Sequence, residues 1–187
     1  MKTINLVRFA AAALLAAGAL SAQTGPWDAS ASLVLPLDGL KAVTQTKGLG
    51  GATLEGGYNN RIANTKIPFR LSASLNVLPG EEANYVKSSL LGLQGAAEVL
   101  VPTGFQRLDM VAGLSLNWWR WDYEDATHHA TETIKGAKMG ARFGFEYHID
   151  RRWSASALLQ MTELGVNPDH SHGYNPSWIQ VGAKYHF

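Results

Sequence analysis

The chain contains no cysteine among its 187 residues. A disulfide framework is therefore excluded, and so is a lipid anchor attached to a cysteine after export. The fold must instead be stabilised by hydrogen bonds and by the burial of side chains. A closed β-barrel is one fold that meets this requirement, because closure pairs the backbone of every strand.

Strong net charge and long apolar runs are also absent. The chain carries 16 basic and 15 acidic residues, a balance unlike the basic footprint of nucleic-acid-binding proteins, so we expect no nucleic-acid partner. Beyond the N-terminal region, no run approaches the roughly 20 apolar residues that a transmembrane helix needs. If the mature protein crosses a bilayer, it must therefore cross as β-strands.

The N-terminal segment has the pattern of a secretory signal peptide. Lys2 and Arg8 precede an apolar run that ends at Leu20 and is followed by the small residues Ser21 and Ala22. The run is about a dozen residues long, which is too short to span a membrane as a helix. These features predict export from the cytoplasm.

We expect cleavage after Ser21 or Ala22, which divides the chain into a signal peptide, residues 1–22, and a barrel domain, residues 23–187. Removal of two basic residues leaves the mature domain with a net charge of about −1. A cytoplasmic amphipathic helix is the alternative, and the glycine and polar residues within 23–26 disfavour it.

The mature chain alternates apolar and polar residues with a period of two, as expected for strands with one apolar face. Phe143 and Phe145, for example, alternate with Arg142 and Glu146. The predicted strands cover residues 27–37, 52–58, 67–77, 91–101, 108–118, 137–148, 153–162 and 179–187. We therefore predict an all-β fold: an eight-stranded antiparallel up-and-down transmembrane β-barrel.

The last segment of the chain alternates in the same way and ends on an aromatic residue. Gln180, Gly182, Tyr185 and Phe187 have the spacing of the signal by which bacterial outer-membrane barrels are recognised for assembly. With the signal peptide, they make the chain resemble the small bacterial outer-membrane β-barrel family, such as the transmembrane domain of outer membrane protein A and outer membrane protein W. The resemblance implies a location in the cell outer membrane, with outer-membrane lipid and the barrel assembly machinery as partners.

The predicted connections alternate between longer and shorter ones, an asymmetry typical of outer-membrane barrels. The longer connections are expected outside the cell, because the C-terminal strand of such barrels runs toward the periplasm. They lie near residues 38–50, 78–88, 122–135 and 164–176. The shorter, periplasmic connections lie near residues 59–66, 102–106 and 149–152.

All six tryptophans lie at the ends of predicted strands, where membrane barrels place their aromatic girdles, although soluble sandwiches also have aromatic residues at strand ends. The predicted periplasmic girdle consists of Trp27, Tyr58, Tyr147, Trp153, Tyr185 and Phe187. The predicted outer rim consists of Trp118, Trp121, Tyr123 and Trp178, with Trp119 on the inward side.

Charged residues on the polar faces are predicted to point into the barrel lumen. They are Glu55, Arg70, Glu98, Asp109, Lys138, Arg142, Glu146 and Lys184. Because an unpaired buried charge costs several kcal/mol, four acids and four bases on one surface predict an internally paired network. Eight strands leave room for little more than side chains, which disfavours a general diffusion pore.

Two of the predicted outer loops contain histidines. His128 and His129 lie in the third loop, and His170 and His172 lie in the fourth. Acidic neighbours are Asp125, Glu132 and Asp169. Imidazole and carboxylate groups are ligands of first-row metals, so surface capture of zinc, copper or nickel is one hypothesis. The alternative is a soluble loop without a dedicated metal site, and we expect no cofactor.

No catalytic constellation is visible in the sequence. A nucleophile needs a base within hydrogen-bond reach and a third group that orients this base. The segment His170-Ser171-His172 does not match the motif of the outer-membrane lipid A deacylases, and no cleft is implied for an acid–base pair of Glu98 and Glu146. We therefore expect no enzymatic activity.

Three functions remain open. The first is a non-enzymatic outer-membrane barrel with a salt-bridged interior, whose surface loops have structural, contact or ligand-binding roles. The second is a narrow channel or transporter for small or hydrophobic solutes. The third is a soluble periplasmic barrel that binds an apolar ligand, which would require the apolar faces to point inward.

Overall fold

The computed structural model describes residues 26–37, 50–62, 67–79, 86–125, 130–162 and 177–187, and these residues form eight β-strands. The strands are β1 (Trp27–Leu37), β2 (Gly51–Arg61), β3 (Pro68–Leu78), β4 (Val86–Pro102), β5 (Leu108–Asp125), β6 (Ala130–His148), β7 (Trp153–Thr162) and β8 (Ser177–His186). Across these ranges, no helix is long and apolar enough to span a membrane. The predicted signal peptide lies outside the described residues.

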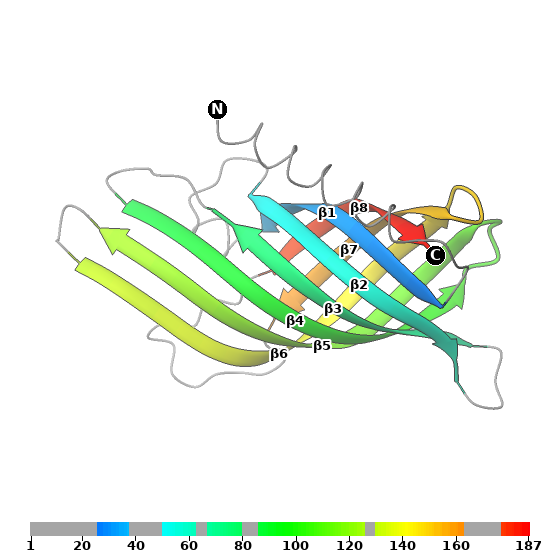
Figure 1. Cartoon of the computed structure of the whole chain (residues 1–187), viewed down its shortest axis with the longest axis horizontal. Helices are drawn as coiled ribbons and strands as arrows, with labels where there is room; N and C mark the ends of the chain where they lie inside the picture. Colours follow the sequence, from blue (N-terminus) through cyan, green and yellow to red (C-terminus); the bar gives the residue numbers. More distant parts are fainter. Residues whose placement is uncertain (1–25, 38–49, 63–66, 80–85, 126–129, 163–176) are drawn as a thin grey trace.

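Each strand pairs antiparallel with its neighbours in sequence, and the sheet closes into a barrel where β1 pairs with β8 (Figure 1). The closing seam extends from Asp28, opposite His186, to Leu37, opposite Ser177. Closure leaves neither β1 nor β8 with an unpaired edge along this seam. The predicted eight-stranded up-and-down barrel is confirmed.

The two faces of the barrel wall differ in polarity. On β7, Ser154, Ser156 and Gln160 are buried in the lumen, while Trp153 and Met161 are exposed on the outside. The outward band includes Leu33, Leu35, Leu71, Leu93, Leu114, Leu116, Met139, Phe143, Phe145 and Val181. Polar side chains inside and apolar ones outside are the arrangement of a membrane barrel. The third alternative, a soluble barrel with its apolar faces pointing inward, is therefore wrong.

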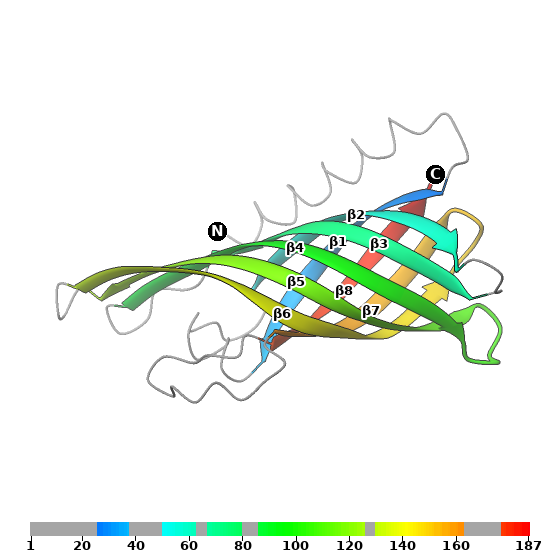
Figure 2. The same cartoon turned by 90° about the horizontal axis from the view of Figure 1, so that it is seen from below.

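Three strands extend far beyond the rest of the barrel (Figures 1 and 2). The pairing of β3 with β4 ends where Leu78 meets Leu90, and that of β6 with β7 ends where Gly140 meets Thr162. Beyond these levels β4, β5 and β6 remain paired with one another, and β6 continues for roughly 30 Å at a strand rise of about 3.3 Å per residue. We call this part the projecting sheet.

The projecting sheet corrects two of the predicted long connections. Residues 122–135 are mostly strand, because β5 pairs with β6 up to Asp125 opposite Ala130, and β4 begins at Val86 within the predicted connection 78–88. The period-two pattern in fact continues here, since three aromatic residues alternate with Arg120, Asp122 and Glu124. The alternation could therefore have extended the predicted strand 108–118 into this segment.

At the opposite end of the barrel, tight turns connect β4 to β5 and β6 to β7, and we call it the short-turn end. The turn between β4 and β5 contains Gly104 with a φ of +84° and Arg107 with a φ of +67°. The left-handed backbone of Arg107 is unfavourable for a residue with a side chain. It is held by the next turn, since the Arg107 carbonyl accepts a 2.7 Å hydrogen bond from the His148 backbone N–H and its guanidinium donates to the Ile149 carbonyl at 3.1 Å.

The turn between β6 and β7 is closed by Asp150. Its carboxylate accepts hydrogen bonds from the backbone N–H groups of Arg152, at 2.7 Å, and Trp153, at 2.8 Å. These bonds hold the pKa of the exposed Asp150 carboxyl below its ordinary value. The turn is therefore favoured above that ordinary pKa and loosens as the pH falls through the lowered one.

An apolar layer fills the lumen where the projecting sheet leaves the barrel. It consists of Val34, Leu78, Leu90, Trp119 and Trp178. The two indoles pack edge to face, with ring centroids 5.2 Å apart and an interplanar angle of 88°. The predicted place of Trp178 at the outer rim is wrong: it lies on the same face as the lumen residue Gln180 and is fully buried.

A glycine makes room for this tryptophan pair. A Cβ atom at Gly92 on β4 would overlap the ring of Trp119, whereas a Cβ atom at Gly95, which points outward, would meet no other atom. The absence of a side chain at Gly92 is therefore a packing requirement. Sequence periodicity alone gives no sign of it.

We expect the substitution Gly92→Ala to destabilise the barrel by about 1–3 kcal/mol, because the added methyl group displaces the Trp119 ring from a filled layer. Gly95→Ala is the matched control and should change the stability by less than about 0.5 kcal/mol. Urea unfolding of both variants in detergent, followed by tryptophan fluorescence, measures the difference. Equal stabilities would show that the Trp119 ring does not depend on Gly92.

Candidate functional site in the barrel lumen

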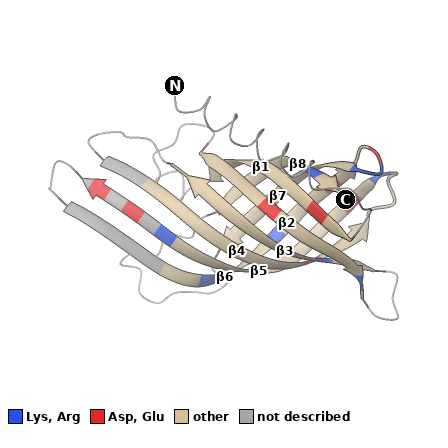
Figure 3. Ribbon diagram, in the orientation of Figure 1, with Lys and Arg blue, Asp and Glu red and all other residues tan. Residues whose placement is uncertain are grey.

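Seven charged side chains from six strands meet in the lumen, between the apolar layer and the short-turn end. We call them the ion cluster, and they are Asp28, Glu55, Arg70, Glu98, Arg142, Glu146 and Lys184. Each side chain is at most 3% exposed. Figure 3 shows charged residues on the barrel strands and on the projecting part of β5.

Arg70 on β3 connects three other strands through its guanidinium group. Its Nε donates to Asp28 Oδ2 on β1 at 3.1 Å, and its Nη1 donates to Glu98 Oε2 on β4 at 3.3 Å. Its Nη2 donates across the lumen to Glu146 Oε2 on β6 at 2.8 Å. One arginine therefore ties opposite walls of the barrel together.

Arg142 and Lys184 complete the ion cluster from the other side. Arg142 Nη1 lies 2.7 Å from a carboxylate oxygen of Glu55 and 2.9 Å from one of Glu98. Lys184 Nζ lies 3.2 Å from Glu146 and 3.8 Å from Glu55. Every cationic group in the cluster thus faces at least two carboxylates, which offsets the cost of removing it from water.

A layer of uncharged polar side chains separates the ion cluster from the apolar layer. Gln94 Nε2 donates to Gln160 Oε1 at 2.6 Å, and Gln160 Nε2 donates to Ser115 Oγ at 2.9 Å. Gln180 Nε2 donates to Thr53 Oγ1 at 3.2 Å. These bonds join β4 to β7 and β8 to β2, so side chains cross the lumen at this level as well.

Imidazole groups lie at the short-turn end of the lumen. His148 Nε2 is 2.9 Å from Asp109 Oδ2, and His148 Nδ1 is 2.9 Å from Ser154 Oγ. The same hydroxyl is 2.8 Å from His186 Nε2, which in turn lies 3.6 Å from Glu146 Oε1. This group links the ion cluster to the barrel mouth.

The structure brings six of the eight predicted lumen charges together in the ion cluster. The other two, Asp109 and Lys138, lie outside it, and only the predicted lumen position of Lys138 is wrong. Asp109 is inward but pairs with His148 at the mouth. Lys138 is exposed, because it lies on β6 beyond the level at which β7 ends. The parity of a residue along a strand gives its face and not its depth in the lumen.

Sequence reasoning missed Asp28 and the two inward histidines, His148 and His186. Asp28 shares a face with Ser30 and Ser32 on β1, so the alternation in the sequence could have identified it. The serine–histidine–aspartate contact at the mouth was missed for a different reason. It joins Asp109, His148 and Ser154 from three strands whose pairing is set by the turns.

A family model described as the outer membrane protein beta-barrel domain matches residues 8–187. The chain belongs to this family. It is an outer-membrane β-barrel protein, and its location is the cell outer membrane. No curated protein matches the sequence.

Solved structures of other outer-membrane barrels have the same fold. Neisserial surface protein A matches with a TM-score of 0.55 at 13% identity, over 86% of this chain and 96% of that chain. Ail, the attachment invasion locus protein of Yersinia pestis, matches with a TM-score of 0.55 at 11% identity, over the same shares. OprG from Pseudomonas aeruginosa matches with a TM-score of 0.53 at 13% identity, over 88% and 97%. At such low identity these neighbours support the fold alone.

The residues of the predicted assembly signal all take part in the folded barrel. Gln180 is buried and accepts a hydrogen bond from Arg142 at 3.3 Å. A Cβ atom at Gly182 would overlap Ser32 across the closing seam. Tyr185 packs edge to face on Phe187, with ring centroids 5.3 Å apart. Recognition of these residues by the assembly machinery stays a prediction.

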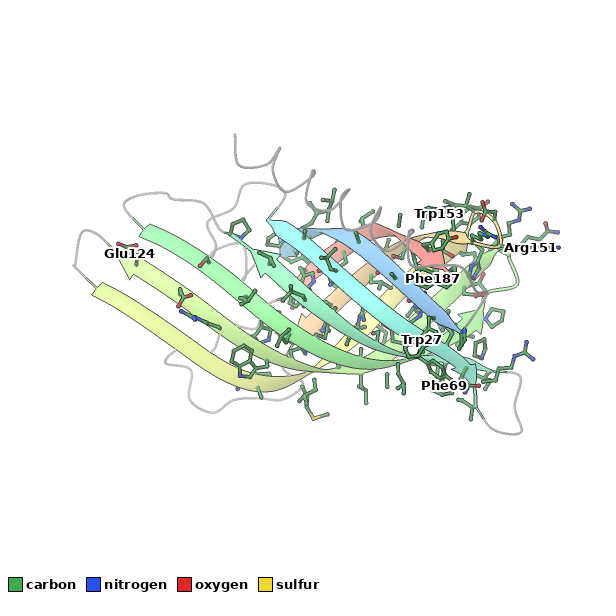
Figure 4. The ribbon with its side chains drawn as sticks, in the orientation of Figure 1. Trp27, Phe69, Glu124, Arg151, Trp153 and Phe187 are labelled. Atoms are coloured by element: carbon green, nitrogen blue, oxygen red, sulfur yellow. The ribbon has the colours of Figure 1, made fainter. Side chains whose placement is uncertain are left out.

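Aromatic pairs gather at the short-turn end of the outer-membrane barrel. Trp27 packs on Tyr58 and Trp153 packs on Tyr185, each with ring centroids 5.0 Å apart. Figure 4 places Trp27, Trp153 and Phe187 at this end. This arrangement is the girdle expected where the barrel wall meets the membrane interface.

The predicted metal ligands of the outer loops are four histidines with acidic neighbours. His128, His129, His170 and His172 lie outside the described residues. Their acidic neighbours Asp125 and Glu132 lie on β5 and β6 rather than in a loop. Surface metal capture by these loops stays a hypothesis.

We expect the substitution Arg142→Met to destabilise the outer-membrane barrel by about 3–5 kcal/mol, because it leaves Glu55 and Glu98 buried without this cationic partner. Arg120→Met is the control, since Arg120 pairs with Asp122 in solvent and should contribute about 0–1 kcal/mol. The loss of the folded band on unboiled SDS gels with increasing temperature compares the variants. An unchanged transition in Arg142→Met would rule out a paired network.

Proposed function

We propose that the protein is a non-enzymatic outer-membrane barrel with a closed lumen, which displays the projecting sheet at the cell surface for contacts with other molecules or surfaces. The observation that supports this proposal most strongly is the filled lumen. Arg70 reaches from β3 to Glu146 on β6, and both side chains are at most 1% exposed. Eight-stranded barrels of this size have little space beyond their side chains.

A diffusing solute would have to displace several layers in turn. It would first meet the apolar layer with Trp119 and Trp178, then the amide layer with Gln94 and Gln160, and then the ion cluster. Opening the last layer would separate buried ion pairs, which costs several kcal/mol. These layers favour a closed barrel over the alternative of a narrow channel or transporter.

The contact between Asp109, His148 and Ser154 contains the residue types of a hydrolase triad but lacks features that catalysis needs. The Ser154 side chain is fully buried, so a substrate carbonyl could not reach its oxygen. The backbone on both sides of Ser154 pairs with β6 and β8, which leaves no free N–H groups there for an oxyanion. This geometry argues against hydrolysis at these three residues.

The outward wall supports outer-membrane lipid as a partner. An apolar groove of about 380 Å³ lies over β5–β8 and is lined mainly by outward side chains, including Met110, Phe143, Phe145, Leu159 and Ile179. Acyl chains match this surface in polarity. The groove faces away from the lumen, so filling it would leave the ion cluster unchanged.

In planar lipid bilayers, we expect the wild-type protein to show no discrete channel openings at moderate voltage, because the layers of side chains close the lumen. The control variant Lys184→Ala separates conduction through the lumen from leakage around the protein. Openings of the wild type whose amplitude changes in Lys184→Ala would contradict the proposal and favour a narrow channel.

The orientation of the projecting sheet can be tested because the chain has no cysteine of its own. Glu124, on the projecting sheet, and Arg151, at the short-turn end, are both exposed and lie at opposite ends of the molecule (Figure 4). We expect a bulky, membrane-impermeant maleimide to label Glu124→Cys on intact cells. The matched variant Arg151→Cys should react only after the outer membrane is permeabilised, and the reverse pattern would contradict display of the sheet at the cell surface.

A further inference from the structure

Two histidines and a glutamate converge at the short-turn end of the lumen. Ligand atoms of Glu146, His148 and His186 all lie within 4.8 Å of one another. Glu146 and His148 are two residues apart on β6 and therefore share a face. His186 lies on β8, beyond the small residue Ser154 of β7, and the two imidazole rings approach across that serine with centroids 6.0 Å apart.

One oxygen of the Glu146 carboxylate is buried without a hydrogen-bond donor. Oε2 accepts hydrogen bonds from Arg70 at 2.8 Å and from Lys184 at 3.2 Å. Oε1 has no hydrogen-bond partner and points to His186, whose Nε2 lies 3.6 Å away. A buried acceptor left unpaired costs free energy, and a cation bound at this point would remove that cost.

Asp109 orients one of the two imidazole rings toward the same point. Its carboxylate lies 2.9 Å from His148 Nε2, which leaves His148 Nδ1 directed at the Ser154 hydroxyl, the group that also contacts His186. A carboxylate on the far nitrogen of a histidine fixes the ring orientation, as is usual for histidines that bind metal ions. Asp109 would therefore act as a positioning residue.

The Ser154 hydroxyl marks where the two histidine nitrogens converge. It lies 2.9 Å from His148 Nδ1 and 2.8 Å from His186 Nε2. A metal ion bound by both nitrogens would replace two hydrogen bonds with two coordination bonds. The serine is then dispensable for metal binding, whereas both rings are required.

The charge balance of the described lumen residues also favours a divalent cation. Five carboxylates face three cationic groups at this end of the lumen. The carboxylates are Asp28, Glu55, Glu98, Asp109 and Glu146, and the cationic groups are Arg70, Arg142 and Lys184. A bound dication would neutralise the excess of two negative charges.

We propose that Glu146 Oε1, His148 Nδ1 and His186 Nε2 bind one divalent first-row metal ion, with zinc as the best match. Two imidazoles and one carboxylate form a recurrent zinc ligand set that leaves a fourth position for water. The bound ion would join β6 to β8 across β7 and close the mouth of the lumen. This site is separate from the histidines of the predicted outer loops.

The test titrates zinc chloride into the full-length protein in detergent and measures binding by calorimetry. The four loop histidines are first removed together, as His128→Asn, His129→Asn, His170→Asn and His172→Asn. This background should still bind one zinc ion per barrel. Loss of that ion with the loop histidines would overturn the proposal and assign the metal to the loops.

In the same background, His148→Asn and His186→Asn should each weaken zinc binding by at least about 100-fold, and Asp109→Asn by about 10- to 100-fold. The matched control Ser154→Ala should bind zinc as tightly as the background. Each variant is first checked for the band shift on boiling that marks a folded barrel. Unchanged affinity in folded His148→Asn and His186→Asn, or equal loss in Ser154→Ala, would overturn the proposal.

Discussion

The constraint on which the rest of the structure depends is the lack of water in the bilayer to bond backbone N–H and C=O groups. Pairing β1 with β8 meets this constraint, because it joins the first and last strands of the sheet. Residues along the seam must allow close approach, which is why Gly182 opposite Ser32 carries no side chain. Closure in turn fixes which residues face the lumen, since a shift by one residue would turn every side chain to the other face.

Closure creates an interior too narrow for bulk water and too polar to pack as an apolar core. The side chains resolve this conflict by pairing with one another. Arg70 illustrates the solution, because its single guanidinium donates hydrogen bonds to carboxylates from β1, β4 and β6. One cation therefore pairs with buried acids from three strands. The aromatic layer of Trp119 and Trp178 closes the lumen at the other end and depends on the missing side chain of Gly92. Charge pairing and shape therefore close the barrel at different depths.

Much of the fold could be predicted from the sequence because a barrel wall repeats one simple rule. Alternation identified all eight strands and six members of the ion cluster, including Arg142 and Glu146 on β6. The prediction failed where the environment changes along a strand: the connection predicted over residues 122–135 includes Asp122, which lies on a paired strand and pairs with Arg120 in solvent. The two-residue alternation also does not show how deep in the barrel a residue lies, so Lys138 was grouped with the lumen charges. Contacts between strands far apart in sequence, such as His148 with His186, require the register that only the folded chain supplies.

The order of the layers gives the two ends of the barrel different chemistry. From the projecting sheet inward, a ligand would meet apolar rings, then amides, then paired charges, whereas from the short-turn end it would meet imidazoles and carboxylates at once. His148 and His186 keep side-chain exposures of 34% and 22%, while Glu146 beside them has 1%. A small ion that approached Glu146 from the short-turn end would meet these partly exposed histidines and not the apolar layer, whereas larger partners would contact the projecting sheet at the opposite end. A closed lumen is thus compatible with an ion-binding mouth, because binding there completes the pairing of charges that closure requires.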